Sequence, residues 1–297
     1  MATVGIVGLG LLGGAVASRL RAAGHAVVGH DVAPARGAAL EAMGGKAADS
    51  PAAVARAAEA VCTVLPSLAV VEDVILGASG LITALRPEQP VIQMSTISPV
   101  LTDRLATALA VKSLAFLDCP ISGTSGMVAR GDGIIFVGGD RALYERWQPV
   151  LESVLPRSIF IGRAGQAMAL KLIANLLVAL HSAAAAEALN MAARAGLDLP
   201  LALEVLRSSA AGSRMLDVRG PMMVRDEFPA QMKLDLFMKD LHLIQDAAGS
   251  LGAAVPLTDV AERLYADAMS RGHHHDDLSV VIRTLADLRS PAPAQTR

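Results

Sequence analysis

The order in which strand-like and helix-like segments follow one another is the feature that most constrains this chain. Up to Ile161, short runs rich in β-branched residues alternate with longer alanine-rich segments, a pattern typical of a parallel sheet covered by helices. From Gln166 onward the patterns are helical only. We therefore expect a doubly wound α/β domain over residues 1–163 and an all-α domain over residues 164–297, opened by a long interdomain helix. The expected strands are 3–7, 26–30, 61–65, 91–94, 115–117, 134–137 and 158–161.

Composition excludes several classes of protein. Hydrophobic residues make up 53% of the chain and the net charge is only -2, which excludes a disordered chain and leaves no basic block for nucleic acid. The most apolar stretch, residues 167–180, is interrupted by Lys171 and Asn175, so we expect no membrane span. The N-terminus lacks the charged segment and cleavage site of a secretory signal. We expect a soluble cytoplasmic protein, and a disordered tail from Ser290.

A glycine-rich turn follows the first expected strand and opens the first expected helix. Its residues are Gly8, Leu9, Gly10, Leu11, Leu12 and Gly13. In a G-x-G-x-x-G turn the first glycine permits the tight turn, the second lets a pyrophosphate approach, and the third lets the helix pack on the strand. Asp31 follows 23 residues after Gly8, at the end of the next strand, where a carboxylate binds the adenosine ribose. This context predicts a Rossmann-type dinucleotide site, against the alternative of an ordinary turn with a surface aspartate.

The identity of the dinucleotide depends on two side chains near the second strand. The carboxylate of Asp31 would repel a 2′-phosphate, which favours NAD over NADP. Arg36 lies close by in the sequence and could accommodate that phosphate. We expect NAD as the cofactor, with NADP as the less favoured possibility.

Further motifs follow in a fixed order from about Gly5 to Ile282. They are Ala23–His25, Val64–Ser67, Gln93–Pro99, Asp118–Thr124, Gly162–Gly165 with Lys171 and Asn175, and Leu236–Leu241. Together they resemble the β-hydroxyacid dehydrogenase family, the group of 3-hydroxyisobutyrate dehydrogenase and tartronate semialdehyde reductase. The resemblance implies an NAD-dependent oxidoreductase that transfers a hydride between a small 3-hydroxy acid and nicotinamide, giving the semialdehyde or keto acid reversibly.

Lys171 and Asn175 are the expected catalytic residues. They are four residues apart, so on a helix they project from one face. A lysine among Ala, Leu and Ile is expensive to bury unpaired, and desolvation in a cleft favours its neutral form, which can exchange a proton with a substrate hydroxyl. The Asn175 amide could hold the same oxygen or the substrate carboxylate. The alternative is a lysine that only reaches out to water; the family resemblance favours catalysis.

Ser122, Gly123 and Thr124 are the expected substrate-binding residues. Hydroxyls and backbone N–H groups in a loop after a strand suit a carboxylate, although they also suit an ordinary polar loop. Many family members have a second glycine where this chain has Thr124. That side chain would narrow the acid pocket or add a hydroxyl contact.

Four further residues are assigned to the cofactor mainly by the resemblance. Leu65 and Pro66 would shape the wall on the adenosine side, and Lys239 would reach toward the cofactor. The alternative for Lys239 is a solvated ion pair with the adjacent Asp240. Thr96 would donate a hydrogen bond near the nicotinamide, or cap the helix that begins at Pro99, or do both.

Three alternatives remain beside this interpretation. The run His273–Asp277 invites a metal site, but consecutive histidines point in different directions and the chemistry needs no metal, so we expect none. An imine reductase would share the fold but lack the lysine. A non-catalytic dinucleotide-binding module would mediate assembly only.

The long apolar helix needs a partner surface, so we expect a homodimer or a higher homo-oligomer.

Overall fold

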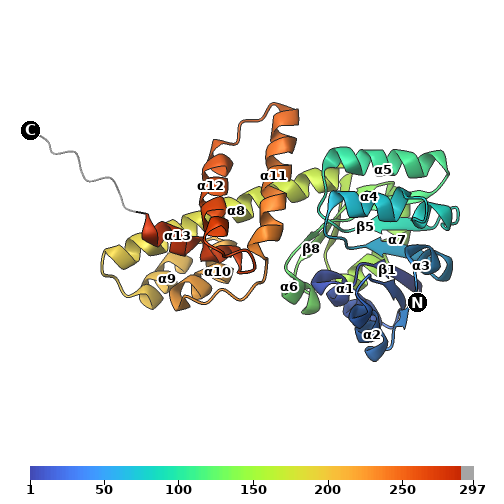
Figure 1. Ribbon diagram of the computed structural model, residues 1–297, viewed down its shortest axis with the longest axis horizontal. Helices are drawn as coiled ribbons and strands as arrows, with labels where there is room; N and C mark the ends of the chain where they lie inside the picture. Colours follow the sequence, from blue (N-terminus) through green and yellow to red (C-terminus); the bar gives the residue numbers. More distant parts are fainter. Residues whose placement is uncertain (289–297) are drawn as a thin grey trace, which may run out of the picture. The chain divides into compact units, whose positions relative to one another are not determined.

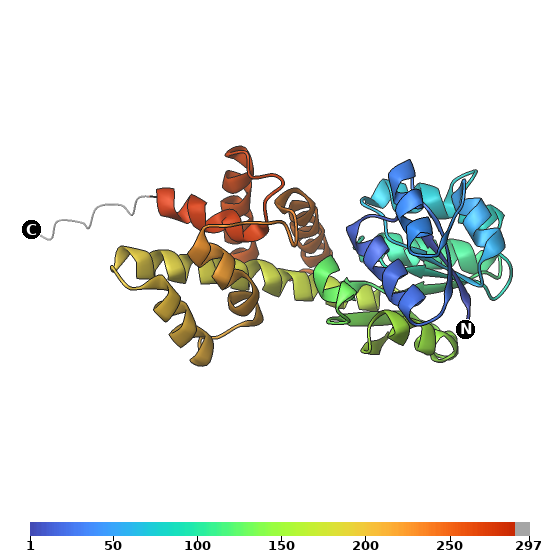
Figure 2. The same cartoon turned by 90° about the horizontal axis from the view of Figure 1, so that it is seen from below.

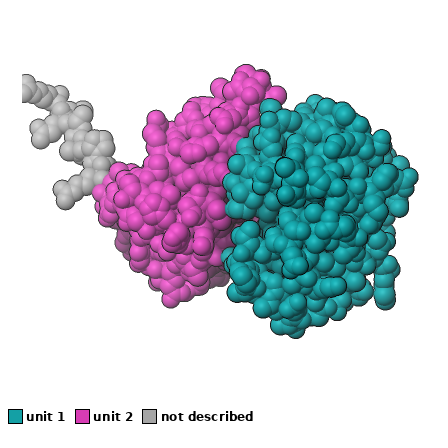
Figure 3. All heavy atoms as spheres, turned by 45° about the vertical axis from the view of Figure 1, so that its right-hand side comes forward, with its two compact units in different colours: residues 1–173 teal, residues 174–297 magenta. Residues whose placement is uncertain are grey.

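The computed structural model describes residues 1–288, so the disordered tail expected from Ser290 lies outside the described residues. The chain divides into two compact units, residues 1–173 and a second unit that begins at Ala174 (Figure 3). The change from strand to helix comes after Gly162, beside the boundary predicted at residues 163 and 164. The two compact units, by contrast, divide inside the long helix that follows.

Within the described residues, nine strands of the first unit form one sheet in the order β3-β2-β1-β4-β5-β6-β8-β7, with β9 paired to β8. The strands β1 to β6 pair in parallel. They are β1 (Thr3–Val7), β2 (Ala26–His30), β3 (Lys46–Ala47), β4 (Ala60–Thr63), β5 (Pro90–Gln93), β6 (Ala115–Asp118), β7 (Ile121–Ser122), β8 (Ile134–Gly139) and β9 (Ser158–Gly162).

Helices cover both faces of this sheet (Figures 1 and 2). One apolar core contains Leu20 and Trp147 against one face, and a second contains Val54, Ile75 and Leu105 against the other. The Rossmann-type doubly wound domain is therefore confirmed. Its helices are α1 (Leu11–Ala22), α2 (Pro34–Ala42), α3 (Pro51–Ala57), α4 (Leu68–Leu76), α5 (Pro99–Val111), α6 (Ser125–Ala129) and α7 (Arg141–Val154), with a 3₁₀ turn at Leu81–Thr83.

One edge of the sheet departs from the parallel arrangement that the sequence pattern indicates. β8 runs antiparallel to β6 and to β7. A parallel return needs a crossover of a dozen or more residues, usually a helix. Residues 119–133, between β6 and β8, are long enough for such a crossover, but they form β7 and the five-residue α6. They turn the chain back beside the strand it has just left.

The described part of the second unit is built from helices joined by loops, as the sequence predicts, with one isolated β-bridge between Lys233 and Asp277. α8 (Gln166–Arg194) begins in the first unit and continues into the second. Within the second unit, α10 packs on α9, and α12 packs on both α11 and α13. The bounds are α9 (Leu199–Ser208), α10 (Arg214–Arg225), α11 (Leu234–Leu251), α12 (Pro256–Ser270) and α13 (Val281–Asp287), with a 3₁₀ turn at Leu278–Val280.

By length and composition alone, α8 could cross a membrane. It has 29 residues, and its most apolar window has a mean hydropathy of 1.6. In the structure 44% of that window is buried. The absence of a membrane span therefore stays a prediction, supported by the two polar residues that interrupt the helix.

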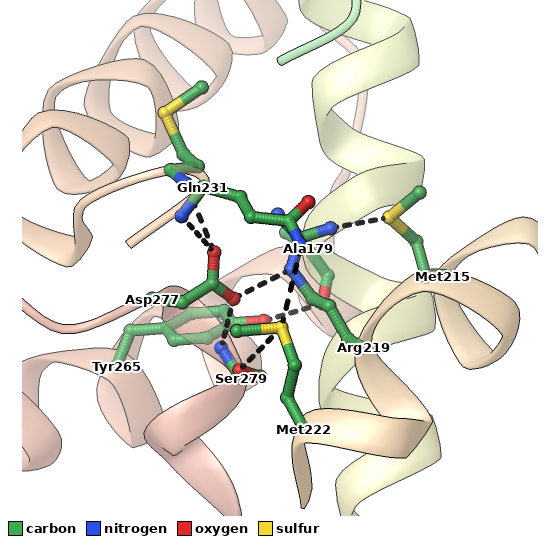
Figure 4. A network of polar contacts seen from close by, with 9 residues as sticks. Ala179, Met215, Arg219, Met222, Gln231, Tyr265, Asp277 and Ser279 are labelled. Carbon is green, nitrogen blue, oxygen red and sulfur yellow. Dashed lines mark hydrogen bonds and ion pairs between the residues drawn. The ribbon is translucent and has the colours of Figure 1, made fainter. Parts of the chain in front are cut away.

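A buried ion pair organises the second unit (Figure 4). The Arg219 Nε donates to Asp277 Oδ1 at 3.0 Å, and both side chains are buried. The same oxygen accepts the amide of Ser279, while Oδ2 accepts the amides of Gln231 and Met232. Asp277 thus ties α10 to two separate connecting segments. Asp277, the last residue of the run His273–Asp277, is therefore buried and bonded by the protein's own groups.

Arg219→Met should destabilise the protein by about 3–5 kcal/mol, because it leaves the Asp277 carboxylate buried without its counter-charge. Urea unfolding would measure the loss. The matched control is Arg283→Met, whose pair with Asp226 is solvent-exposed and whose removal should cost about 1 kcal/mol or less. Equal losses in the two variants would contradict the importance of the buried pair.

Candidate active site

The three glycines of the first turn have three different surroundings. Gly8 has φ +94°, and a Cβ there would overlap the Val64 carbonyl oxygen. A Cβ on Gly13 would overlap the Gly8 carbonyl oxygen, so only glycine lets α1 approach β1 this closely. Gly10 has open space where its Cβ would be, and no side chain caps the helix it begins. An unfilled cradle with free helix N–H groups fits a pyrophosphate.

The other three residues of the turn differ in how far their side chains are exposed to solvent. Leu9 is buried in the core, whereas Leu12 is half-buried and Leu11 is exposed at the start of α1. Leu9 therefore anchors the turn. Leu11 also lines the cavity beside Gly10.

Asp31 is joined directly to the glycine-rich turn. Its Oδ2 accepts the Leu9 amide at 2.7 Å, and its Oδ1 accepts the Ala33 amide at 2.9 Å. The carboxylate at the end of β2 is thus held beside the turn in a defined orientation. A cavity of about 180 Å³ is lined by Gly10 and Leu11 on one side and by Arg36 on the other.

The loops after β4 and β5 are hydrogen-bonded to each other. The Leu65 amide donates to Ser95 Oγ at 2.8 Å. Leu65 is half-buried, Pro66 is exposed, and Thr96 follows Ser95 directly. The cap of α5 is Ser98, whose Oγ accepts the Leu101 amide at 3.1 Å. The helix-capping alternative for Thr96 is therefore wrong.

Ser122 ends β7, beyond the carboxyl end of β6. Gly123 follows it, and Thr124 caps α6 by accepting the Met127 amide at 3.2 Å. The extra side chain at position 124, relative to the glycine of many family members, therefore has a local structural use. Its hydroxyl hydrogen stays available to a carboxylate.

Lys171 and Asn175 lie one turn apart on α8 and are both buried, with 6% and 4% of their surfaces exposed. The alternative of a lysine that reaches out to water does not fit this burial. In the second unit, Asn175 Nδ2 donates to Asp240 Oδ2 at 2.8 Å. A carboxylate only accepts hydrogen bonds, so the NH₂ group of Asn175 must be the end that faces Asp240. The carbonyl oxygen of Asn175 therefore points away from Asp240.

Asp240 is a residue that sequence reasoning left without a role. It is buried on α11, and its Oδ1 lies 3.4 Å from Lys239 Nζ. The pair is therefore not the solvated surface pair that the sequence allowed. Asp240 brings together two predicted site residues, Asn175 and Lys239. The signal in the sequence was its place immediately after Lys239.

Asp118 is the second residue that sequence reasoning left without a role. It ends β6, is fully buried, and accepts the amides of Gly165 at 3.1 Å and Met168 at 3.0 Å through Oδ2. Burial raises the pKa of Asp118 to about 7, although the two amide bonds act in the opposite direction. The carboxylate thus lies at the start of α8, the helix that carries Lys171.

The other candidate groups form no cluster for metal or nucleophilic chemistry. Across residues 1–288, no group of three or more His, Cys, Asp or Glu side chains is placed to hold a metal. His273 Nδ1 lies 2.7 Å from Asp276 Oδ2, within its own loop. Both cysteines are buried, and burial raises the pKa of Cys62 to about 12 and that of Cys119 in the same direction. Neither thiol is a nucleophile at neutral pH.

Known proteins match this chain along nearly its whole length. Residues 3–162 match the NAD-binding domain of 6-phosphogluconate dehydrogenase, and residues 165–285 match a family described as NAD-binding of NADP-dependent 3-hydroxyisobutyrate dehydrogenase. L-Threonate dehydrogenase of Escherichia coli K12 is 34% identical over 291 residues, which are 97% of this chain and 96% of that protein. The chain belongs to the β-hydroxyacid dehydrogenase family.

Two further members of the family show how far the likeness extends. The 2-hydroxy-3-oxopropionate reductase of Escherichia coli K12 is 30% identical over 282 residues, covering 95% of this chain and 96% of that protein. The 3-hydroxyisobutyrate dehydrogenase of Mycobacterium tuberculosis, solved with L-serine, is 30% identical with a TM-score of 0.87, over 96% of this chain and 99% of that chain. The predictions of an enzyme and of an NAD(P)-dependent dehydrogenase of this family are confirmed.

Imine reductases share this architecture at much lower identity. A variant of the Myxococcus stipitatus imine reductase, solved with NAD⁺, is 17% identical with a TM-score of 0.63, over 96% of this chain and 99% of that chain. At that identity the likeness shows the fold alone.

The glycine-rich turn that this chain shares with its family yields a paired prediction. Gly13→Ala should destabilise the protein by about 1–3 kcal/mol, because its Cβ would overlap the Gly8 carbonyl. Gly10→Ala, with open space and φ −61°, should leave folding stability unchanged but weaken dinucleotide binding about tenfold or more. Urea unfolding and dinucleotide titration would measure both. A Gly10→Ala protein that binds dinucleotide as well as wild type would contradict the assignment of the cradle.

Proposed function

We propose that this protein is an NAD-dependent dehydrogenase of a small 3-hydroxy acid, with Lys171 as its general acid and base. The observation that carries the proposal is the burial of Lys171, in the second turn of α8, four residues before the equally buried Asn175. A buried ammonium group is costly in a helix of Ala, Leu and Ile. Proton transfer gives that position a use, since desolvation favours the neutral amine that can accept a proton.

The proposed reaction divides its work between the chain and the cofactor. When bound, the nicotinamide ring accepts a hydride from the carbinol carbon of the substrate, or returns it. Lys171 Nζ takes the hydroxyl proton as the C–O bond becomes a carbonyl, and gives it back in the reverse direction. Asn175 orients the substrate. The amide group it directs to Asp240 leaves its carbonyl oxygen to accept from a hydroxyl.

The remaining residues of the proposal bind the two ligands. Ser122, Gly123 and Thr124 would hold the substrate carboxylate through hydroxyl and backbone donors. The glycine-rich turn and Asp31 would hold the dinucleotide, with Leu65, Pro66 and Thr96 along its wall and Lys239 reaching it. The substrate class follows the relatives, which are named for threonate, 3-hydroxyisobutyrate and 2-hydroxy-3-oxopropionate.

A soluble, cytoplasmic homodimer is the proposed form of the enzyme. On the second unit, Leu201 and Val205 of α9 are exposed at a spacing of one helical turn, and so are Leu257 and Val260 of α12. A second copy of the chain would cover such apolar positions. A single-chain mass in sedimentation equilibrium would refute the dimer, and recovery in the membrane fraction would refute solubility.

Lys171→Ala should abolish turnover while leaving NAD affinity nearly unchanged, because the lysine would act on the substrate hydroxyl and not on the dinucleotide. A loss of about 10²-fold or more in kcat is the size expected for a lost general base. Steady-state kinetics and NAD titration would measure the two quantities, with circular dichroism to check folding. If Lys171→Ala retained a comparable kcat, its proposed role would be wrong.

The cofactor preference is tested through Asp31. Wild type, assayed with a panel of 3-hydroxy acids, should use NAD better than NADP. Asp31→Asn keeps the shape but removes the charge that repels a 2′-phosphate, so the ratio of kcat/KM for NAD over NADP should fall about tenfold. Arg36→Gln is the opposing control and should lower any residual use of NADP. An unchanged ratio in Asp31→Asn would contradict the assignment.

The same panel separates the alternative reaction. Imine reductases share the fold, so a cyclic imine with NADPH is included as substrate. Lys171 and Asp31 both argue against this activity. Strong imine reduction together with no turnover of any hydroxy acid would overturn the proposed function.

A further inference from the structure

The start of α8 depends on a side chain from a distant strand. Gly165 precedes the helix and has φ +85°, so the position that usually supplies a capping side chain has none. Asp118, 47 residues earlier at the end of β6, accepts the Gly165 amide. It also accepts the Met168 amide in the first turn. A buried carboxylate of the sheet thus does the work of a local cap.

Burying a carboxylate to cap a helix costs more free energy than burying a hydroxyl group. The Oδ2 of Asp118 has two amide partners, but its Oδ1 is buried with no hydrogen-bond partner. The serine and threonine caps of α3, α4, α5 and α6 show that a neutral hydroxyl suffices in this chain. A buried charge with half of its acceptors unused is a feature that stability alone does not explain.

The carboxylate is bonded to the amide of Met168, which precedes Lys171 by three residues on α8. Met168 and Lys171 are three residues apart, so they occupy neighbouring positions on one side of α8. The N-terminal end of a helix carries a partial positive charge, which by itself disfavours an ammonium group close to that end. A carboxylate at the same end offsets that charge.

We propose that Asp118 is a positioning residue for Lys171: it fixes the first turn of α8 and supplies the negative charge that sets the basicity of the lysine. This inference rests on the proposed role of Lys171. It goes beyond it by assigning a second buried ionisable group to the same proton transfer.

The charged groups around Asp118 define its titration. Asp103 on α5 is a like charge and raises the pKa of Asp118, while it pairs with Arg163 in the loop before α8. Cys119, next in the chain, stays protonated at neutral pH, as does Cys62 on β4. The two backbone amides lower the pKa, but burial outweighs them and brings it to about 7. Asp118 is therefore charged above neutral pH, where hydroxy acid oxidation needs a neutral lysine.

The sign of the stability effect follows from that raised pKa. A carboxyl group that titrates near 7 when folded, and near its ordinary 3.8 when unfolded, destabilises the folded state as pH rises between those values. Asp118→Asn removes the charge and keeps an acceptor for the two amides. The variant should unfold at a higher urea concentration than wild type at pH 8, and the difference should shrink toward pH 4.

The decisive measurement is the pH profile of kcat/KM for oxidation of the best hydroxy acid. Without the Asp118 charge, the pKa of Lys171 should fall, so the acidic limb of the profile should move by about one unit to lower pH. The matched control is Asp103→Asn, which removes a neighbouring carboxylate that is half-exposed and screened by water. Its profile should move far less than that of Asp118→Asn, because Asp103 acts on the lysine only through its smaller effect on the pKa of Asp118.

Each outcome decides between the roles. A shifted profile in a variant as stable as wild type or more stable supports positioning. An unshifted profile overturns it, and so does a variant that is less stable and loses dinucleotide binding, which is the behaviour of a purely structural cap. Lys171→Met, assayed in parallel, separates the two proposals. If it turns over normally, the proposed base and this inference both fail, whereas a dead Lys171→Met beside an unshifted Asp118→Asn refutes this inference alone.

Discussion

Helix α8 begins on a carboxylate that belongs to the sheet, and much of the molecule depends on that attachment. The amides of Gly165 and Met168 both donate to Asp118, so the first turn of the helix is fixed to the end of β6. Everything that follows in the chain continues from this helix: Lys171 in its second turn, Asn175 in its third, and then the helices of the second unit. The carboxyl edge of a parallel sheet is where ligands bind in open α/β folds. Starting α8 there leaves Lys171 in the second helical turn from that edge.

The glycine-rich turn meets the same edge by a different physical route. Gly13 is required because helix and strand are in contact, and Gly8 because its backbone is left-handed against Val64. Gly10 alone has free space around it. Gly8 and Gly13 are therefore needed for close packing, whereas Gly10 leaves the space that the proposed dinucleotide would occupy. The Asp31 carboxylate is bonded to the Leu9 amide and so stabilises the turn.

Local patterns in the sequence predicted most of the fold. β1 and β2 have the bounds expected from their β-branched runs, and α8 begins at Gln166, as its alanine-rich pattern predicts. The errors concern distant partners. β8 turns antiparallel because the segment before it forms β7 and the short α6 and no crossover helix, and hydrophobic periodicity carries no information on strand direction. Thr96 looked like a cap by its spacing from Pro99, but Ser98 is nearer and accepts the bond.

The predicted site residues show the same division. A motif can single out Lys171, Asn175 and Lys239, because each is a polar residue in a recognisable pattern. It cannot show that Asp240 joins two of them across 65 residues of sequence, or that Asp118 caps a helix 47 residues away. Such partners are defined by the tertiary fold. Sequence reasoning names the residues that act more readily than those that orient them.

A comparison of the buried carboxylates of Asp277 and Asp118 distinguishes a charge that is buried for structure from one that is buried for function. Asp277 has both oxygens filled by its own chain, with one guanidinium and three backbone amides. Asp118 has one oxygen filled twice and the other left without a partner. A buried charge with every acceptor in use is accounted for by the contacts it holds together. One that is half satisfied costs more free energy than its contacts require, and we infer that it persists where its charge also acts on something else. By this criterion Arg219 and Asp277 belong to the architecture of the second unit, and Asp118 belongs with Lys171.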